Sequence, residues 1–210
     1  MCTMVMSQHR EDLIQAIDDP RFITRGNRLL SLSTLPENKK DVWKGEEALL
    51  TRSAIEGLQE AQDAVFVLHA QSPTGTAYSA HPARVDETRL WHNGQLIDYG
   101  GTSHQSWDTE WLANQLSLTL QDPQYIRDVL DNAKGSFACI WEIEGDIFVF
   151  RNAMSPLFYS STAVASINVH SGYKSVEANV LYSASFNSTD GKLNLTEVLR
   201  FNNRYNPYGL

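Results

Sequence analysis

The stretch GSFACIWEIEGDIFVFR, residues 135–151, constrains the fold of this chain more than any other part of the sequence. Two runs rich in β-branched and aromatic residues meet there at Glu144-Gly145, a pattern that indicates a β-hairpin. Two further strands are predicted in NVLYSASF (179–186) and KLNLTEVLRF (192–201). The C-terminal half should therefore build an antiparallel sheet.

Helices are predicted where apolar residues recur at helical spacing, over 8–18, 46–60, 106–116 and 123–133. Ser106 or Asp108 is the predicted N-cap of the third helix. Strands precede and follow the last two helices, an order that favours antiparallel sheets with segregated helices over alternating βαβ units.

The N-terminal half adds an opening apolar strand, a buried strand at 64–70 and a hairpin in 89–100 that turns at His92-Asn93-Gly94. Residues 27–45 show no clear period and are interpreted as an irregular connection. Without repeats or a linker, residues 1–210 are expected to form a single α+β domain.

Charge and composition exclude several classes of function. The chain has 17 basic and 25 acidic residues, a net charge of −8, so it offers no broad attraction for nucleic acid or anionic lipid. It contains neither a membrane-spanning apolar run nor the apolar core of a signal peptide, which predicts a cytoplasmic protein without membrane contact. The spacings of the two cysteines and six histidines indicate no disulfide framework, metal site or metal cofactor.

Cys2 is the first candidate for chemistry. Removal of Met1 would leave a thiol and a free α-amine on one residue, and the amine, with a usual pKa of about 7.7–8.0, can act as the base for its own thiol. A small apolar residue on a first strand would explain Cys2 equally well. Cys139, in an apolar run, is interpreted as a core residue.

Several short motifs follow Cys2 in a fixed order: Arg25-Gly26, LHAQSPTG (68–75), WHNGQL (91–96), WDTE (107–110), GSFACI (135–140) and FRNAMSPLFYSS (150–161). Each motif alone is weak. Together the order resembles the glutaminase domain of class II glutamine amidotransferases, which belong to the N-terminal nucleophile (Ntn) hydrolases. The resemblance implies a four-layer αββα sandwich of two antiparallel sheets.

The resemblance also implies roles for particular residues. Cys2 would attack the side-chain amide of glutamine, and Asn93 and Gly94 would hold the oxyanion, each donor contributing about 3–4 kcal/mol. Asp108 would bind the α-ammonium group. The other positions matching the family's substrate-binding elements are Arg25, Gln71, Thr74 and Gly75.

The chain departs from the family most clearly at Gln71, which stands where an arginine grips the α-carboxylate of glutamine. Arg84 or Arg89 could take that role instead. The family's histidine between threonine and glycine is also absent from SPTG, and the spacing from Asn93 to Asp108 is short. The first hypothesis is a stand-alone glutaminase that supplies ammonia to a separate synthetase, since the chain ends without room for a synthase domain. The alternatives are a catalytically silent binding or regulatory protein and an Ntn amidohydrolase for a different amide.

Overall fold

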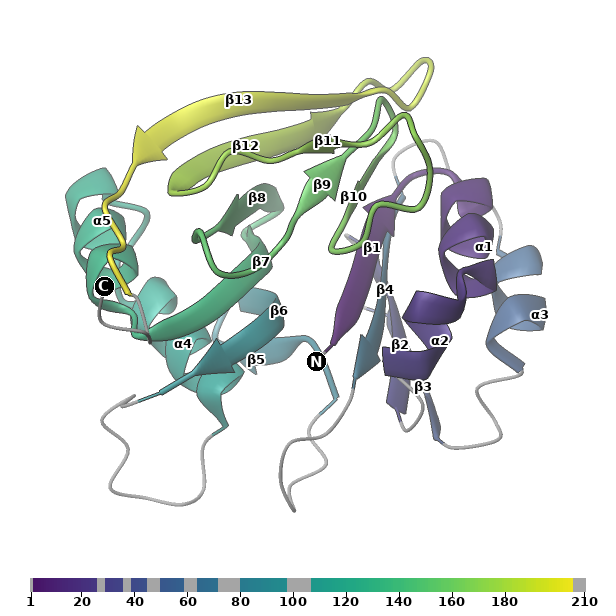
Figure 1. Cartoon of the computed structure of the whole chain (residues 1–210), viewed down its shortest axis with the longest axis horizontal. Coiled ribbons are helices and arrows are strands. Elements are labelled where there is room, and N and C mark those ends of the chain that lie inside the picture. Colours follow the sequence, from purple (N-terminus) through teal and green to yellow (C-terminus); the bar gives the residue numbers. More distant parts are fainter. Residues whose placement is uncertain are drawn as a thin grey trace. The chain divides into compact units, whose positions relative to one another are not determined.

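The computed structural model describes residues 2–25, 29–35, 39–44, 50–58, 64–71, 80–97 and 107–205 (Figure 1). The chain divides into two compact units. Unit 1 comprises Met1–His81, Leu157–Ser175 and Ser185–Asn194, and unit 2 comprises Pro82–Pro156, Val176–Ala184 and Leu195–Leu210. Each unit is described by itself.

The sheet of unit 1 has seven strands in the order β11-β9-β10-β1-β4-β2-β3, and all its described pairings are antiparallel. Its strands are β1 (Thr3–Ser7), β2 (Leu29–Leu35), β3 (Lys39–Lys44), β4 (Val65–Gln71), β9 (Phe158–Tyr159), β10 (Ala163–Ala165) and β11 (Lys174–Ser175). β1 lies between β4 and β10, so the first strand of the chain is held on both edges.

Three helices belong to unit 1: α1 (Arg10–Asp18), α2 (Pro20–Arg25) and α3 (Leu50–Glu56). α1 and α2 contact β1, and α3 packs against α1. Leu13 and Ile17, one helical turn apart, enter the same apolar cluster as Val5 of β1 and Phe66 of β4. This cluster fixes the helix-bearing face of the sheet.

The second sheet has six strands in the order β13-β12-β8-β7-β6-β5, again with antiparallel pairings. The strands are β5 (Ala83–Val85), β6 (Thr88–Leu96), β7 (Gly135–Ile143), β8 (Asp146–Arg151), β12 (Val180–Phe186) and β13 (Leu193–Arg200). The longest ladder joins β6 and β7 over nine residue pairs, from Thr88 opposite Ile143 to Leu96 opposite Gly135.

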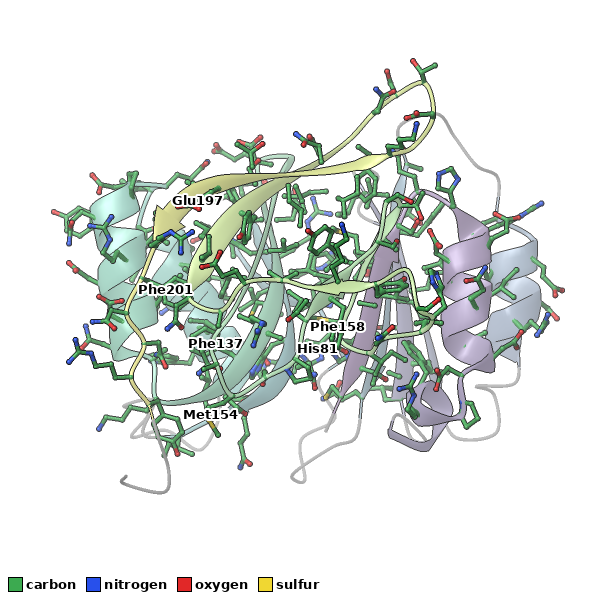
Figure 2. All side chains as sticks on the ribbon, turned by 45° about the horizontal axis from the view of Figure 1, so that its top comes forward. His81, Phe137, Met154, Phe158, Glu197 and Phe201 are labelled. Carbon is green, nitrogen blue, oxygen red and sulfur yellow. The ribbon has the colours of Figure 1, made fainter. Side chains whose placement is uncertain are left out.

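Unit 2 carries two helices, α4 (Asp108–Ser117) and α5 (Pro123–Asn132). α4 contacts β5, β6 and α5. Asp122 caps α5, accepting from the backbone N–H of Gln124 at 2.8 Å, and a proline follows the cap where no N–H is needed. The core includes Phe137 and Phe201, whose rings stack with centroids 6.2 Å apart (Figure 2).

The structure confirms the α+β class and the two antiparallel sheets. It also confirms the hairpin at Glu144-Gly145, where β7 and β8 meet and both residues have positive φ. The four predicted helices correspond to α1, α3, α4 and α5. Whether residues 1–210 form a single domain stays a prediction.

The interpretation of residues 27–45 as an irregular connection is wrong. This segment contains β2 and β3, which pair antiparallel from Leu29 opposite Lys44 to Thr34 opposite Lys39. Alternation within LLSLSTL sends Leu30 and Leu32 into the core under the helices, whereas serines occupy the intervening positions. β2 is buried almost throughout, but its buried serines gave the sequence no apolar run by which to predict a strand.

The predicted turn at His92-Asn93-Gly94 is wrong as well. β6 runs straight through these residues, with Gly94 opposite Phe137 of β7. The tight turn lies earlier, between β5 and β6, where Asp86 has φ 49°. Asn-Gly here marks a close approach of two strands instead of a reversal of the chain.

The predicted cap of α4 is also corrected. Trp107 occupies the N-cap and makes no side-chain cap hydrogen bond, and Asp108 is the first helical residue. Ser106 lies outside the described residues.

Candidate functional site

The first group of candidate residues lies in unit 1, around the start of β1. Cys2 directly precedes β1 and is 8% exposed. Thr3 pairs with Ala70 of β4, so continuing the antiparallel register by one residue brings Cys2 opposite Gln71. The order of the strands therefore joins two candidates that are far apart in sequence.

Cys2 and Gln71 also share one face of their sheet. Successive side chains of a strand point to opposite faces, and Val5 and Leu68 point to the helix-bearing face, where they join the apolar cluster. By the same alternation Cys2, His69 and Gln71 lie on the face away from the helices. Cys2, the candidate nucleophile, and Gln71, where the family has arginine, therefore lie on the same face of the sheet.

Gln71 contacts a histidine that the sequence motifs did not include. Its Oε1 lies 3.3 Å from Nδ1 of His81, and the ring of His81 stacks on His69 with centroids 3.8 Å apart. Gln71, His69 and His81 are all buried. The side chain at this position thus presents a neutral amide tied to an imidazole, where the family has a permanent cation.

The remaining candidates of unit 1 are less completely described. Arg25 is the last residue of α2, and its side chain is outside the described part of the structure. Thr74 and Gly75 also lie outside the described residues. Their roles in substrate binding stay predictions.

The second group lies on β6 in unit 2. Asn93 is 1% exposed and pairs with Ala138 of β7. Its side-chain Oδ1 is buried and has no hydrogen-bond partner among the residues that the structure describes. Such an atom costs about 1–3 kcal/mol, and native proteins keep few of them, often where a ligand or reaction uses them. This oxygen can accept a hydrogen bond from a ligand, whereas holding an oxyanion would fall to the Nδ2–H groups of the same amide.

Only glycine fits at position 94. Its φ is +152°, and a Cβ there would lie 2.0 Å from the backbone oxygen of Ser136 and 2.7 Å from Nε2 of His92. No flexible side-chain end can move aside to relieve the closer clash, because it involves backbone. The close approach of β6 to β7 thus requires a glycine beside Asn93.

Asp108 ties the end of β6 to the start of α4. One carboxylate oxygen accepts from the backbone N–H of Leu96 at 3.0 Å, and the other accepts from that of Thr109 at 2.9 Å. His92, with Nδ1 3.1 Å from the hydroxyl of Thr109, lies 3.8 Å from Asp108. A carboxylate has about four acceptor positions, so these bonds leave capacity for a cationic group.

A buried polar network holds the end of β7 that faces Gly94. Asn152 donates to the carbonyl of Gly135 at 2.8 Å and accepts from the N–H of Phe137 at 3.2 Å. It also contacts Asn203, which donates to the carbonyls of Leu130 and Ala133 at the end of α5. The last turn of α5 and the first residues of β7 are thereby fixed together.

Arg89, considered above as a carboxylate clamp, already has a partner. Its Nε lies 2.6 Å from Oε2 of Glu142, whose side chain is 2% exposed. Burial raises the pKa of the Glu142 carboxyl, and Arg89 acts against that rise. If Arg89 moved to bind a substrate, the buried Glu142 carboxylate would lose its ion-pair partner. Arg89 is therefore a poor candidate for the carboxylate clamp.

Two further expectations concern cysteine and metal. Cys139 on β7 is fully buried in the core of unit 2, as predicted, and burial raises the pKa of its thiol. Within the described ranges, no group of three or more histidine, cysteine, aspartate or glutamate side chains could hold a metal ion. No described helix is long and apolar enough to cross a membrane.

Sequence motifs found the positions on β6 but missed the groups around them. His81 follows Gln71 by ten positions and belongs to no recognisable pattern. Thr109 and Ser136 belong to the motifs WDTE and GSFACI, but their contacts with His92 arise only because α4 and β7 fold against β6. Such contacts arise from tertiary packing and leave no local signal.

Comparison with known proteins rests on structure. Neither a protein-family model nor a curated protein matches the chain. Among solved structures, an allosteric regulatory enzyme of purine biosynthesis aligns with a TM-score of 0.66 over 96% of this chain and 50% of its own, at 17% identity. Glutamine phosphoribosylpyrophosphate amidotransferase from B. subtilis, complexed with ADP and GMP, aligns with a TM-score of 0.59 over 94% of this chain and 49% of its own, at 15% identity.

The chain thus spans about half the length of these two enzymes. At such identities the likeness concerns the fold, and it covers nearly all of this chain. It confirms the Ntn-hydrolase fold type that the order of motifs predicts. The chain has the fold of the class II glutamine amidotransferase domain.

Proposed function

We propose that this protein is a glutamine amidotransferase of the Ntn type, in which the thiol of Cys2 releases ammonia from the side-chain amide of glutamine. The observation that carries the proposal is the Asn93-Gly94 pair on β6. Asn93 is buried and directly precedes Gly94 on this strand. The pair carries the two donors that an oxyanion would need, the side-chain Nδ2–H of Asn93 and the backbone N–H of Gly94.

The reaction proceeds in two steps, formation of a thioester and its hydrolysis. The Cys2 sulfur forms a bond to the amide carbon after its proton passes to the α-amine freed by removal of Met1. The carbon–nitrogen bond then breaks, and the nitrogen leaves as ammonia with that proton. Water next adds to the thioester, which releases glutamate and restores the thiol. Asn93 and the backbone N–H of Gly94 stabilise the oxyanion in both steps.

The remaining assignments follow from the same resemblance. Asp108 receives the α-ammonium group, for which its carboxylate retains acceptor capacity beyond the N–H groups of Leu96 and Thr109. The ammonia goes to a separate synthetase. The chain spans about half the length of the two enzymes of similar fold, so the acceptor of the ammonia is part of the proposal.

Gln71 favours a second candidate, hydrolysis of an amide that lacks an α-carboxylate. Its side chain is neutral and is engaged by His81, so it offers no charged fork for a carboxylate. A neutral amide in place of a bidentate arginine costs about 1.5–3 kcal/mol, or roughly 10–150-fold in affinity for glutamine. A substrate such as 4-aminobutanamide, glutamine without its carboxylate, would escape this cost.

The test is release of ammonia and of the acid product from both amides by the full chain with Met1 removed. We expect activity that Cys2→Ala abolishes and that Asn93→Ala lowers about 10²–10³-fold. Asn114→Ala, at an exposed asparagine of α4, is the matched control and should keep full activity. Turnover of glutamine alone supports the first candidate, and a preference for 4-aminobutanamide the second. Inactivity on both with an intact fold supports a silent binding protein.

A further inference from the structure

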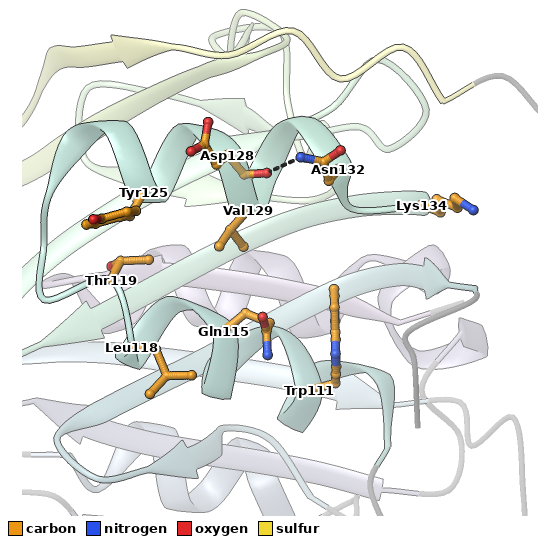
Figure 3. A pocket seen from close by; sticks show the side chains of 9 residues that line it. All are labelled: Trp111, Gln115, Leu118, Thr119, Tyr125, Asp128, Val129, Asn132 and Lys134. Carbon is orange, nitrogen blue, oxygen red and sulfur yellow. Dashed lines mark hydrogen bonds between the residues drawn. The ribbon is translucent and has the colours of Figure 1, made fainter. Parts of the chain in front are cut away.

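A groove of about 390 Å³ runs between α4 and α5 on unit 2 (Figure 3). Trp111, Gln115 and Leu118 line it from the side of α4, and Tyr125 and Val129 line it from α5. Leu118 is 68% exposed and Tyr125 62% exposed. The groove therefore offers apolar surface to solvent, where burial by a partner would be favourable.

A second hollow, of about 370 Å³, is lined by residues of the α4–α5 connection and of the β5–β6 and β7–β8 turns. Leu120 lines it and is 86% exposed. Of the residues lining the two hollows, four are acidic and one is basic: Asp86, Glu87, Asp128 and Glu144, against Lys134. We call Leu118, Leu120 and Tyr125 with the two hollows the α4–α5 surface.

The exposed side chain of Leu120 contributes little to the packing of the described residues. Its φ is +47° and that of Gln121 is +60°, in the left-handed region that costs a non-glycine residue about 1–2 kcal/mol. The turn is closed by the N–H of Asp122, which donates to the carbonyl of Thr119 at 2.9 Å, a bond that needs no leucine. Within the described part of the chain this leucine is left exposed in a strained turn, so a partner that covers it would gain from its burial.

The acidic residues that line the two hollows indicate what kind of partner can bind there. A second copy would bring two acidic rims together, and nucleic acid or anionic lipid would be repelled by the same rim. We propose that the α4–α5 surface docks a second protein through apolar side chains flanked by lysine or arginine. The apolar groups of that partner cover Leu118 and Leu120, and its cations face Glu87 and Glu144.

The test uses two short amphipathic helical peptides with the same leucine face, one flanked by lysine and arginine and the other by glutamate. Each is titrated into the isotopically labelled full chain, and NMR shifts are followed, with the Trp111 indole as a reporter inside the groove. We expect the basic peptide to shift resonances of α4 and α5, with an affinity that falls as salt rises. The acidic peptide should bind at least about tenfold more weakly.

Variants separate the apolar and charged parts of the contact. Leu118→Ser with Leu120→Asn should weaken the basic peptide about tenfold or more, and Glu87→Gln with Glu144→Gln should weaken it and flatten its salt dependence. Val198→Ser, at an exposed valine of β13 outside both hollows, is the control and should change nothing. None of these residues belongs to the proposed amidase machinery, so the result is independent of activity.

Three outcomes would overturn the proposal. Equal binding of the two peptides would remove the role of charge, and shifts confined to other elements would remove the surface. Self-association of the chain by sedimentation, lost in Leu118→Ser, would make a second copy the occupant.

Discussion

At the scale of single residues, the most demanding position is Gly94. The positive φ and the backbone oxygen of Ser136 act together, so the position rejects any Cβ for two reasons. Its neighbour Asn93 keeps a buried oxygen without a partner in the described chain. Both features lie on β6, where Asn93 and Gly94 are opposite Ala138 and Phe137 of β7.

Gly94→Ala should therefore lower the free energy of unfolding by about 1–3 kcal/mol and reduce amidase activity, because β6 must shift away from Ser136. Gly145→Ala is the matched control, since it also has positive φ but meets no atom within 4 Å. Urea denaturation of both variants measures the difference. Equal losses would show that strain in φ, and not the close approach, sets the requirement.

Tyr173 gives a prediction about alkaline stability. Burial, and less strongly the nearby Asp12 carboxylate, raise the pKa of its hydroxyl to about 12, against an ordinary value of 10. Between these two values the unfolded chain loses the proton and the folded chain keeps it, so the stabilisation present below pH 10 is lost as pH rises towards 12.

Tyr173→Phe should flatten the loss of stability between pH 10 and pH 12, by up to about 1.4 kcal/mol for each pH unit. The measurement is urea denaturation across that range, compared with Tyr125→Phe at an exposed tyrosine. The same pH slope in the wild type and in Tyr173→Phe would contradict the assignment.

At the scale of elements, the junction of α5 and β7 depends on one side chain. Asn203 donates to two carbonyls at the end of α5 and contacts Asn152, which fixes Gly135 and Phe137 of β7. These hydrogen bonds join the end of α5 to the start of β7, the strand whose Phe137 is opposite Gly94.

Asn203→Ala should cost about 1–3 kcal/mol, because it leaves buried carbonyls without donors. Hydrogen exchange should speed up in the last turn of α5 and the start of β7 before it does elsewhere. Asn202→Ala, at an exposed neighbour, is the control. A uniform increase in exchange over unit 2 would argue against a local role for the junction.

Elements were predictable where the pattern repeated and unpredictable where polar residues were buried. Helices α1, α4 and α5 and the β7–β8 hairpin follow directly from periodicity and turn residues. β2 was missed because its serines face a buried side, and Asn93-Gly94 was mistaken for a turn because its pairing with β7 is not local. The motifs single out Cys2 and Gly94 as candidates, whereas the contact of His81 with Gln71 required the tertiary structure.

At the scale of the whole molecule, neither unit is a continuous piece of chain. Unit 1 takes its first part from Met1–His81 and later parts from Leu157–Ser175 and Ser185–Asn194. β1 is held on one edge by β4 and on the other by β10, which comes from the later part. One edge of β1 can thus be paired only after residues 163–165 have been synthesised.

A fragment ending at Pro156 should fail to fold, because it lacks β10 and leaves one edge of β1 unpaired. Circular dichroism and proteolysis of this fragment, compared with the full chain, test the point. Adding residues 157–210 as a separate peptide should restore protection if the missing strands are the cause. A stable fragment would show that β10 is dispensable.

The central claim is that Cys2 is a live nucleophile towards a glutamine-like substrate. Its most direct test is the intact mass of the natively expressed protein before and after treatment with 6-diazo-5-oxo-norleucine, a glutamine analogue that alkylates such nucleophiles. We expect loss of Met1 and a single adduct, mapped to Cys2 and absent in Cys2→Ala. Retention of Met1, or a processed protein that gains no adduct, would contradict it.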